Sequence, residues 1–289
     1  MQPVFRKVVI FGVGLIGGSF ALALRRSNAV GEVVGFGRSA ATLKQALQFG
    51  LIDRIGDDVA REVHDADVIL LATPVAQMAE IFARIAPHLG SKTLITDGGS
   101  TKADVVTAAR LQLGVKIDRF IPAHPVAGAE LSGPTAALAD LYQGKKVVLT
   151  PLPENSPADV ARVRAIWEAC GALVSVLTPA QHDEVFAAVS HLPHLLSFAL
   201  VHDIAQRDNR DLLLSFAASG FRDFTRIAAS SPEMWRDICM ANREALSDEL
   251  ERYIALLVMM RLMLKDGDAA KLEEMFSLAR EVRSNWTPQ

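Results

Sequence analysis

Residues 8–17 are Val8-Val9-Ile10-Phe11-Gly12-Val13-Gly14-Leu15-Ile16-Gly17, an apolar run that leads into three spaced glycines. The run predicts a buried strand, and the residues that follow have helical periodicity. In such a unit the first glycine allows a tight turn, the second lets a pyrophosphate approach, and the third lets the helix pack on the strand. Free N–H groups at the helix start favour an anion, so the pattern predicts dinucleotide binding. A glycine turn with a purely structural role is the alternative.

The predicted cofactor contacts extend beyond the three glycines. We expect Leu15 and Ile16 in the glycine turn to lie against the dinucleotide. We also expect contacts from Thr73 and Pro74, which end a later apolar run. The carboxyl ends of parallel strands are where ligands of open α/β sheets bind, and both pairs lie at such ends.

The choice between the two nicotinamide cofactors is made about 20 residues past the glycines, at the end of the second strand. NAD-binding chains usually carry an acid there for the ribose hydroxyls. This chain has Arg38 and Ser39 after Gly37, with no acid. A guanidinium and a hydroxyl suit a 2′-phosphate, so the sequence predicts NADP. The alternative is that Arg38 is only a solvated surface residue.

The first part of the chain alternates apolar strand patterns with helical ones, which predicts a mostly parallel sheet covered on both faces. The predicted strands are residues 7–12, 32–37, 67–73, 92–97, 119–124, 145–151 and 172–177. The predicted helices are 15–27, 40–49, 75–89, one from residue 101, and 158–170. We therefore expect an α/β domain over residues 1–178.

Residues 179–289 show long helical periodicities and no further strand pattern, which predicts a second, all-α domain. One amphipathic pattern covers residues 232–265. As a single helix it would be about 50 Å long, more than a small domain needs. Helices of this kind often pack against a second subunit, so we expect a homodimer through this half. A helix broken near its middle within a monomer is the alternative.

Composition narrows the class of protein. Of 289 residues, 50% are hydrophobic, which is ample for two cores, and the formal net charge is only −3. The charges form no basic patch, so nucleic acid is not an expected partner. Cys170 and Cys239 form no metal-like or redox pair, which favours a reducing, cytoplasmic setting. The apolar run over residues 8–24 resembles a secretory signal, but its glycines and short length argue against a leader or a membrane span.

Two polar clusters follow predicted strands in the first half. Ser100 lies in TDGGSTK at 96–102, where it could cap the next helix, face the nicotinamide, or do both. His124 begins the second cluster, just past a strand end. A histidine can accept a proton from an alcohol as hydride leaves, although a surface role is the ordinary one for a loop histidine. Glu130, in the same cluster, is by itself an ordinary solvated carboxylate.

The helical half carries a third set of polar residues. His191 and His194 flank Pro193 in SHLPH at 190–194. Their spacing could suit a metal, but no cysteine pair or HExxH motif supports one, so no metal is predicted. Arg226 lies further on among apolar residues. Arginine pairs bidentately with carboxylates, with a salt bridge as the default alternative.

Several segments together resemble the prephenate/arogenate (cyclohexadienyl) dehydrogenase family. They are GVGLIGGS at 12–19, DGGSTK at 97–102, HPVAGAELSG at 124–133, SHLPH at 190–194 and GFRDFTRIAASSPEMWRDI at 220–238. The resemblance implies a Rossmann domain followed by a helical dimerisation domain. It also implies NAD(P)-dependent oxidative decarboxylation of prephenate or arogenate, in the synthesis of tyrosine.

The resemblance also implies roles for the polar clusters. His124 would be the base that takes the proton of the ring hydroxyl, and Ser100 would touch that hydroxyl near the nicotinamide. Arg226 would bind a substrate carboxylate and His194 would hold the substrate. Glu130 would belong to a polar network at the entrance. The implied roles of His191 and Lys102 are less specific, with His191 assigned to substrate binding.

Two other functions remain open from the sequence alone. A β-hydroxyacid dehydrogenase or imine reductase joins similar domains, but it would leave HPVAG and SHLPH unexplained. A non-catalytic NADP-binding sensor would bind the cofactor and turn over nothing. The sequence does not distinguish prephenate from arogenate, which share a ring and differ in a keto or amino side chain.

Overall fold

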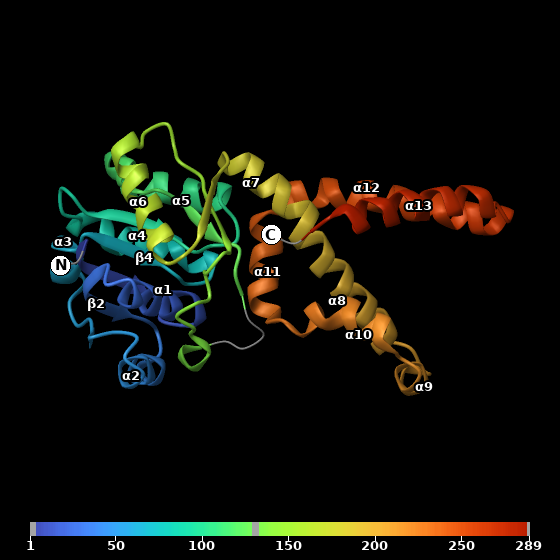
Figure 1. The fold of residues 1–289 in the computed structure, drawn as a ribbon, viewed down its shortest axis with the longest axis horizontal. Coiled ribbons are helices and arrows are strands. Elements are labelled where there is room, and N and C mark those ends of the chain that lie inside the picture. Colours follow the sequence, from blue (N-terminus) through green and yellow to red (C-terminus); the bar gives the residue numbers. More distant parts are fainter. Residues whose placement is uncertain (1–3, 129–132, 288–289) are drawn as a thin grey trace. The chain divides into compact units, whose positions relative to one another are not determined.

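The computed structural model describes residues 4–128 and 133–287, and the chain divides into two compact units (Figure 1). The first unit is Met1–Val185 together with Ala229–Asn242, and the second is Phe186–Ala228 together with Arg243–Gln289. A late segment of the sequence therefore belongs to the first unit. The expected boundary between residues 178 and 179 refers to folding domains and stays a prediction.

Five parallel strands form the central sheet of the first unit, in the order β3-β2-β1-β4-β5. They are β1 (Phe5–Phe11), β2 (Val30–Phe36), β3 (Arg54–Ile55), β4 (Val68–Leu71) and β5 (Leu94–Asp97). Val8 of β1 lies opposite Val33 of β2 and Val68 of β4. The chain reverses its direction of winding at β1, and so the carboxyl ends of β1 and β4 form the crevice in which such sheets bind ligands.

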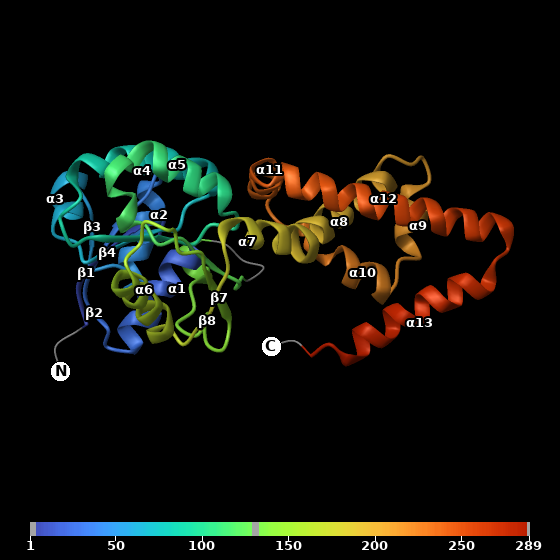
Figure 2. The same ribbon diagram turned by 90° about the horizontal axis from the view of Figure 1, so that it is seen from above.

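Helices cover both faces of this sheet, as its apolar strands require. They are α1 (Leu15–Arg26), α2 (Ala40–Gln48), α3 (Val59–His64), η1 (Val75–Gln77), α4 (Met78–Ile85), η2 (Ala86–His88), α5 (Ala103–Leu113), η3 (Gly114–Arg119) and α6 (Pro157–Ala169). Alternate residues of β1 point to opposite faces: Val8 and Ile10 join the core under α1 and α6, and Val9 and Phe11 join the core under α4 and α5. Figure 2 shows α4 and α5 on one side of the strands and α1 and α6 on the other.

A second, three-stranded sheet lies in the same unit. It consists of β6 (Ala123–Pro125), β7 (Lys146–Leu149) and β8 (Leu173–Val176), with η4 (Pro134–Ala136) between β6 and β7. β6 runs antiparallel to β7, and β8 runs parallel to it. A parallel bridge between Ile95 and Phe120 links this region to β5. The α/β class is confirmed, but the strands form two sheets where the sequence pattern indicated one.

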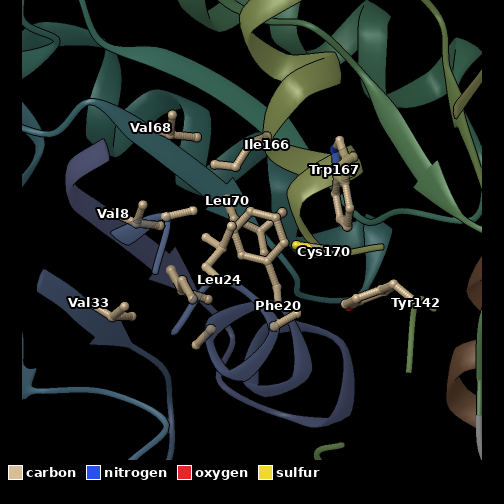
Figure 3. Close-up of a cluster of buried hydrophobic side chains, with 14 of the residues drawn as sticks. Val8, Phe20, Leu24, Val33, Val68, Leu70, Tyr142, Ile166, Trp167 and Cys170 are labelled. Atoms are coloured by element: carbon tan, nitrogen blue, oxygen red, sulfur yellow. The ribbon is translucent and has the colours of Figure 1, made fainter. Parts of the chain in front are cut away.

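The core between the sheet and α1 and α6 is built around large side chains (Figure 3). The ring of Trp167 lies edge-on to Phe20, with centroids 4.8 Å apart, and to Tyr142, at 5.4 Å. Such pairs add to the stabilisation from burial alone. Cys170 lies in the same core, and burial raises the pKa of its thiol. The thiol therefore stays protonated and unreactive, as expected for a structural cysteine.

Beyond β8 the described residues form helices and contain no strand. They are α7 (Pro179–Phe186), the π-helical turn η5 (Ala187–His191), α8 (Leu192–Ala205), α9 (Arg210–Ser215), α10 (Ser219–Thr225), η6 (Arg226–Ala229), α11 (Pro232–Ala241), α12 (Arg243–Asp266) and α13 (Ala269–Asn285). Figure 2 shows the chain turning back between α12 and α13, where Gly267 has a φ of +70°. The expected all-α second half is confirmed.

The prediction of a single helix over residues 232–265 is wrong. Asn242 leaves the helical conformation and separates α11 from α12. Its side-chain Nδ2 donates to the main-chain oxygen of Asp183, at 2.8 Å. This bond holds the end of α11 within the first unit, while α12 belongs to the second. A helical pattern alone does not reveal such an interruption, because Asn242 also fits the polar side of the periodicity.

One helical stretch, Pro179–Ala205, is long and apolar enough to cross a membrane by length and composition. It comprises α7, η5 and α8, and it carries the buried polar pair His182 and Asp183. A helix in the core of a soluble protein meets the same criteria. That this protein has no membrane partner stays a prediction.

A buried ion network fixes the amino ends of the strands. Glu62 of α3 is fully buried and accepts from both terminal nitrogens of Arg54. The ammonium of Lys7, itself buried, lies 2.7 Å from the same carboxylate. The hydrogen bonds from Arg54 hold the pKa of Glu62 well below its usual range, although burial alone would raise it. The network therefore stabilises the fold only while Glu62 is ionised.

Replacing Glu62 by Gln should lower the free energy of unfolding by about 3–5 kcal/mol at neutral pH, because Lys7 then stays buried without its full counter-charge. The folded-state pKa of Glu62 is depressed, so its contribution is present above the unfolded pKa and is lost as the pH falls below it. Urea denaturation from pH 7 to pH 3 should show a flatter decline in the variant than in the wild type. Glu80→Gln, at an exposed position, is the control. Equal stabilities for Glu62→Gln and wild type across this range would contradict the role.

Candidate functional site

The turn between β1 and α1 has the geometry that each glycine was predicted to supply. Gly12 has a φ of +94°, and a Cβ added there would lie 2.5 Å from the main-chain oxygen of Ala72. A Cβ on Gly17 would lie 2.2 Å from the main-chain oxygen of Gly12, so the helix and the turn touch through bare backbone. A Cβ on Gly14 would meet nothing within 4 Å. The turn is therefore closed at its first and third glycines and open at the second.

The open position faces the start of α1, which offers an anion its free donors. No side chain caps this helix, whose N-cap is Gly14, and its first turn contains no acid. Unpaired N–H groups and the helix dipole favour a negatively charged group there. The residues present thus fit the pyrophosphate of a dinucleotide.

Two further loops meet the glycine turn. Thr73, which follows β4, lies beside Gly12, since its Cγ2 is 3.0 Å from a Cβ built on that glycine. Gly98, which follows β5, lies between Ile16 of the turn and Pro125 of β6, at 3.0 and 3.7 Å from a built Cβ. Gly98 therefore brings the cofactor turn and the strand that carries His124 into close contact.

His124 belongs to a buried series of hydrogen bonds. Its Nδ1 lies 2.8 Å from Nε2 of His182, and the Nδ1 of His182 lies 2.7 Å from Oδ1 of Asp183. Asp183 accepts main-chain N–H bonds from Lys102, at 2.9 Å, and from Ala103, at 2.8 Å. The three side chains come from β6 and α7 and meet at the start of α5.

The charges of Asp183 and His182 define which ring nitrogen carries the proton in His182 and in His124. Burial would raise the pKa of Asp183, but the bonds from His182 and from the backbone of Ala103 and Lys102 outweigh it and lower that pKa. Burial lowers the pKa of His182. An ionised Asp183 and a neutral His182 require that His182 donates through Nδ1 and accepts through Nε2. His124 must then donate through Nδ1, so that in its neutral form Nε2 is the basic nitrogen.

Asp183 is also the cap of α5, which corrects one expectation. The sequence suggested Ser100 as the N-cap, but α5 begins at Ala103, its N-cap position is Lys102, and no side chain from the local sequence caps it. The carboxylate of Asp183 fills that role from another helix. Ser100, which is partly exposed, lies two residues before the N-cap position in the loop after β5. Its proposed contact with the substrate hydroxyl stays a prediction.

Three residues, 37–39, join the end of β2 to the start of α2. Arg38 is exposed, and Ser39 is the N-cap of α2, with its hydroxyl accepting from the N–H of Thr42 at 3.2 Å. No acidic residue lies between the end of β2 and the start of α2. The loop after β2 thus carries a positive side chain and a helix start, and both favour an anion.

The remaining predicted substrate residues that the structure describes belong to the second unit. His191 is buried in η5, and His194 lies in the first turn of α8 and donates through Nδ1 to the main-chain oxygen of Ser190, at 2.8 Å. Burial lowers the pKa of His194, and the charge of Arg226 lowers it further. His194 and Arg226 therefore form one polar group within this unit. Glu130 lies outside the described residues.

His182 and Asp183 are functional candidates that the sequence analysis missed. They lie 58 and 81 positions from their partners His124 and Lys102, so no local pattern joins them. The available signal was a His-Asp pair near the start of α7, where Gln181 and Glu184 are also polar. Polar residues are common in a first helical turn, and the pair did not stand out for that reason.

Two family models match the chain. The nucleotide-binding domain of prephenate dehydrogenase matches residues 20–183, and its dimerization domain matches residues 178–278. Together these models cover most of the chain, including the His124–His182–Asp183 group.

Three individual proteins illustrate the similarity. The cyclohexadienyl dehydrogenase of Zymomonas mobilis is 34% identical over 98% of this chain and 96% of its own length. A crystal structure of prephenate dehydrogenase from A. aeolicus, in complex with hydroxyphenyl propionate and NAD+, has a TM-score of 0.90, 34% identity, and coverage of 96% of this chain and 97% of that one. The arogenate dehydrogenase of Synechocystis has a TM-score of 0.83 at 29% identity, over 97% of this chain and 100% of that one. These matches show that the chain belongs to the prephenate dehydrogenase family.

Proposed function

We propose that this protein is an NADP-dependent dehydrogenase that oxidatively decarboxylates prephenate, arogenate or both, in tyrosine biosynthesis. The observation that carries the proposal is the buried His124–His182–Asp183 chain beside a glycine turn suited to a pyrophosphate, in a member of this family. The three hydrogen-bonded side chains supply a base, and the glycine turn supplies a place for the hydride acceptor. Both are needed to oxidise an alcohol.

His124 is the proposed base. A nicotinamide dinucleotide held at the glycine turn would supply the acceptor for the hydride that leaves the ring carbon bearing the hydroxyl group. Nε2 of His124 takes the hydroxyl proton, and the positive charge is stabilised by the bond from Nδ1 to His182 and by the carboxylate of Asp183 beyond it. The bond to the ring carboxylate then breaks, carbon dioxide leaves, and the electron pair completes an aromatic ring whose oxygen takes up a proton. Aromatisation drives this step, so the protein mainly positions and polarises the substrate.

Family resemblance supports three roles in holding the substrate. Ser100 contacts the ring hydroxyl, Arg226 pairs with a carboxylate, and His194 helps to hold the substrate. The lowered pKa of His194 keeps it neutral, so that it can both donate and accept hydrogen bonds. His191 and Glu130 are assigned to the same role by family resemblance alone.

NADP is the proposed cofactor because of Arg38 and Ser39. A guanidinium at this position pairs with a 2′-phosphate, and the N-terminus of α2 adds donors and a favourable dipole. The NAD+ in the A. aeolicus structure belongs to that protein, and it supports a nicotinamide dinucleotide here without deciding between the two.

A homodimer through the helical half and a cytoplasmic location complete the proposal. The family model for this half is described as a dimerization domain. α12 exposes a series of large apolar side chains, namely Ile254, Leu257, Val258, Met259 and Leu262. Apolar surface of this extent is typical of a subunit interface.

The reaction is tested by absorbance at the reduced-nicotinamide band, with purified protein and each combination of NADP or NAD with prephenate or arogenate. NADP reduction with either acid is expected, and the faster acid names the substrate. Arg38→Ala should raise KM for NADP by about 10- to 100-fold, the usual effect of losing a charged hydrogen bond, and leave KM for NAD nearly unchanged. A wild-type preference for NAD would overturn the cofactor assignment. Binding of NADP without turnover of either acid would overturn the reaction.

Substitutions at the glycine turn test the cofactor site. Gly14→Ala should leave the melting temperature unchanged, because its Cβ meets nothing, but should weaken NADP binding by occupying the space meant for the pyrophosphate. Gly17→Ala should instead lower the free energy of unfolding by about 1–3 kcal/mol, because its Cβ would overlap the backbone of Gly12. Calorimetry of NADP binding and thermal unfolding measure the two effects. Normal NADP affinity in Gly14→Ala would place the cofactor elsewhere.

His124→Asn should lower kcat by about 10²–10⁴-fold, the usual contribution of a general base, with little change in NADP affinity. His88→Asn, at an exposed position, is the matched control and should behave as wild type. Steady-state kinetics at pH 7 and at pH 9 measure the effect. Near-normal turnover of His124→Asn would rule out the proposed base.

A further inference from the structure

Lys102 is a lysine with no exposed surface. Its ammonium pairs with the carboxylate of Asp97, which is also fully buried, and donates to the main-chain oxygen of Ala123 at 2.8 Å. An ammonium is costly to bury unless it is paired and hydrogen-bonded, and Asp97 and Ala123 supply these partners. Because Lys102 has no exposed surface, it is not placed to touch a substrate or a cofactor.

The ion pair holds the peptide groups on both sides of Ala123. Oδ1 of Asp97 accepts the N–H of Ala123, at 2.9 Å, while Lys102 donates to its carbonyl oxygen. Oδ2 of Asp97 also accepts the N–H of Gly99, at 2.9 Å. The next residue after Ala123 is His124. The pair therefore fixes the backbone from which His124 projects, and ties it to the loop that contains Gly98 and Ser100.

Lys102 supports His124 by a second route through its main chain. Its N–H donates to Oδ1 of Asp183, the same oxygen that accepts from Nδ1 of His182. The side chain of Lys102 thus holds the strand of His124, and its backbone holds the carboxylate at the far end of the histidine chain. Lys102 therefore links the strand of His124 to the carboxylate of Asp183 and limits how far apart they can lie.

Charge adds to this geometry. Within residues 4–128 and 133–287, the charged and titratable groups that face His182 include His124 from β6, Asp183 beside it on α7, Lys102 before α5 and Asp97 from β5. Burial lowers the pKa of His182 and the charge of Lys102 lowers it further, while Asp183 and Asp97 raise it. A neutral His182 is the form that accepts the Nδ1 proton of His124.

We propose that Lys102 is a positioning residue: with Asp97 it fixes the backbone beneath His124 and maintains the proton arrangement in which Nε2 of His124 is the basic nitrogen. The inference rests on the proposed role of His124 as base. Lys102 acts through His124 and does not contact the reacting atoms. It predicts an effect on the ionisation of the histidine pair that a residue needed only for folding would not have.

The first test compares Lys102→Met with wild type in pH profiles of kcat and of KM for the substrate. The variant should lose about 10- to 100-fold in kcat, because small displacements of a reacting group are costly, with KM changed less than threefold. Removing the ammonium raises the pKa of His182, so the acid limb of the kcat profile should move to higher pH. Lys92→Met, at an exposed position, should leave both parameters and the profile unchanged. A folded Lys102→Met variant with the wild-type profile and kcat would overturn the proposal.

The double variant Asp97→Asn, Lys102→Met covers the case in which Lys102→Met alone does not fold. Replacing both members of a buried ion pair by neutral groups is often tolerated. The influence of Lys102 on His182 exceeds that of Asp97, so the acid limb should still move to higher pH, by less. A folded double variant whose acid limb stays at the wild-type pH would also overturn the proposal.

A spectroscopic measurement separates this inference from the proposed function. In the full chain labelled with ¹⁵N-histidine, the ring-nitrogen signals of His182 are assigned by their absence in His182→Gln. In wild type, Nδ1 of His182 should be protonated and the ring neutral at pH 7; in Lys102→Met the ring should titrate at higher pH. Identical titration of His182 in both proteins would overturn the role of Lys102 even if turnover is normal. A wild type that turns over neither acid but shows this difference would overturn the proposed function and leave the electrostatic role of Lys102 standing.

Discussion

The start of α5 is satisfied by the carboxylate of Asp183, which lies 81 positions further along the chain, and the arrangement around His124 depends on this contact. A helix start needs acceptors for its first N–H groups, and here the acceptor also receives the Nδ1 proton of His182. The main-chain oxygen of the same residue binds Asn242 at the end of α11. One aspartate therefore satisfies α5, orients the histidine pair and ends a third helix.

Buried charge is used in two ways in this unit. At the amino ends of the strands, Lys7, Glu62 and Arg54 join β1, α3 and β3 into a network whose effect is on stability. At the carboxyl ends, Lys102 and Asp97 lie next to the cofactor turn and to His124. The second pair is the more deeply buried, since neither Lys102 nor Asp97 has exposed surface, whereas Arg54 in the first network is 37% exposed. The Lys102–Asp97 pair also holds the backbone of Ala123, and so it restricts the movement of the strand that carries His124.

The fold followed from local patterns to a large extent. The apolar strand into three glycines, and the alternation of strands with helices, are decided by residues within a few positions of one another, which is why β1, α1 and most later elements were predicted. The two-residue strand β3 has no apolar run to reveal it, and the antiparallel pairing of β6 depends on partners distant in sequence. The break at Asn242 depends on a bond to Asp183, and no helical periodicity encodes that bond. The same reasoning explains the site: His124 and Ser100 sit in motifs, whereas His182 gains its meaning only through contacts made in three dimensions.

The placement of α11 affects how the gene can be divided into fragments and how its parts can be exchanged between relatives. Because Ala229–Asn242 belongs to the first unit while the segments on either side belong to the second, neither unit is a continuous piece of sequence. A gene fragment cut once after Val185 would encode the first unit without α11, and its complement would carry a helix foreign to the rest. Exchange of a whole unit between relatives would require three matched crossovers within the helical half, after Val185, Ala228 and Asn242. The two halves of this protein are therefore expected to be inherited together.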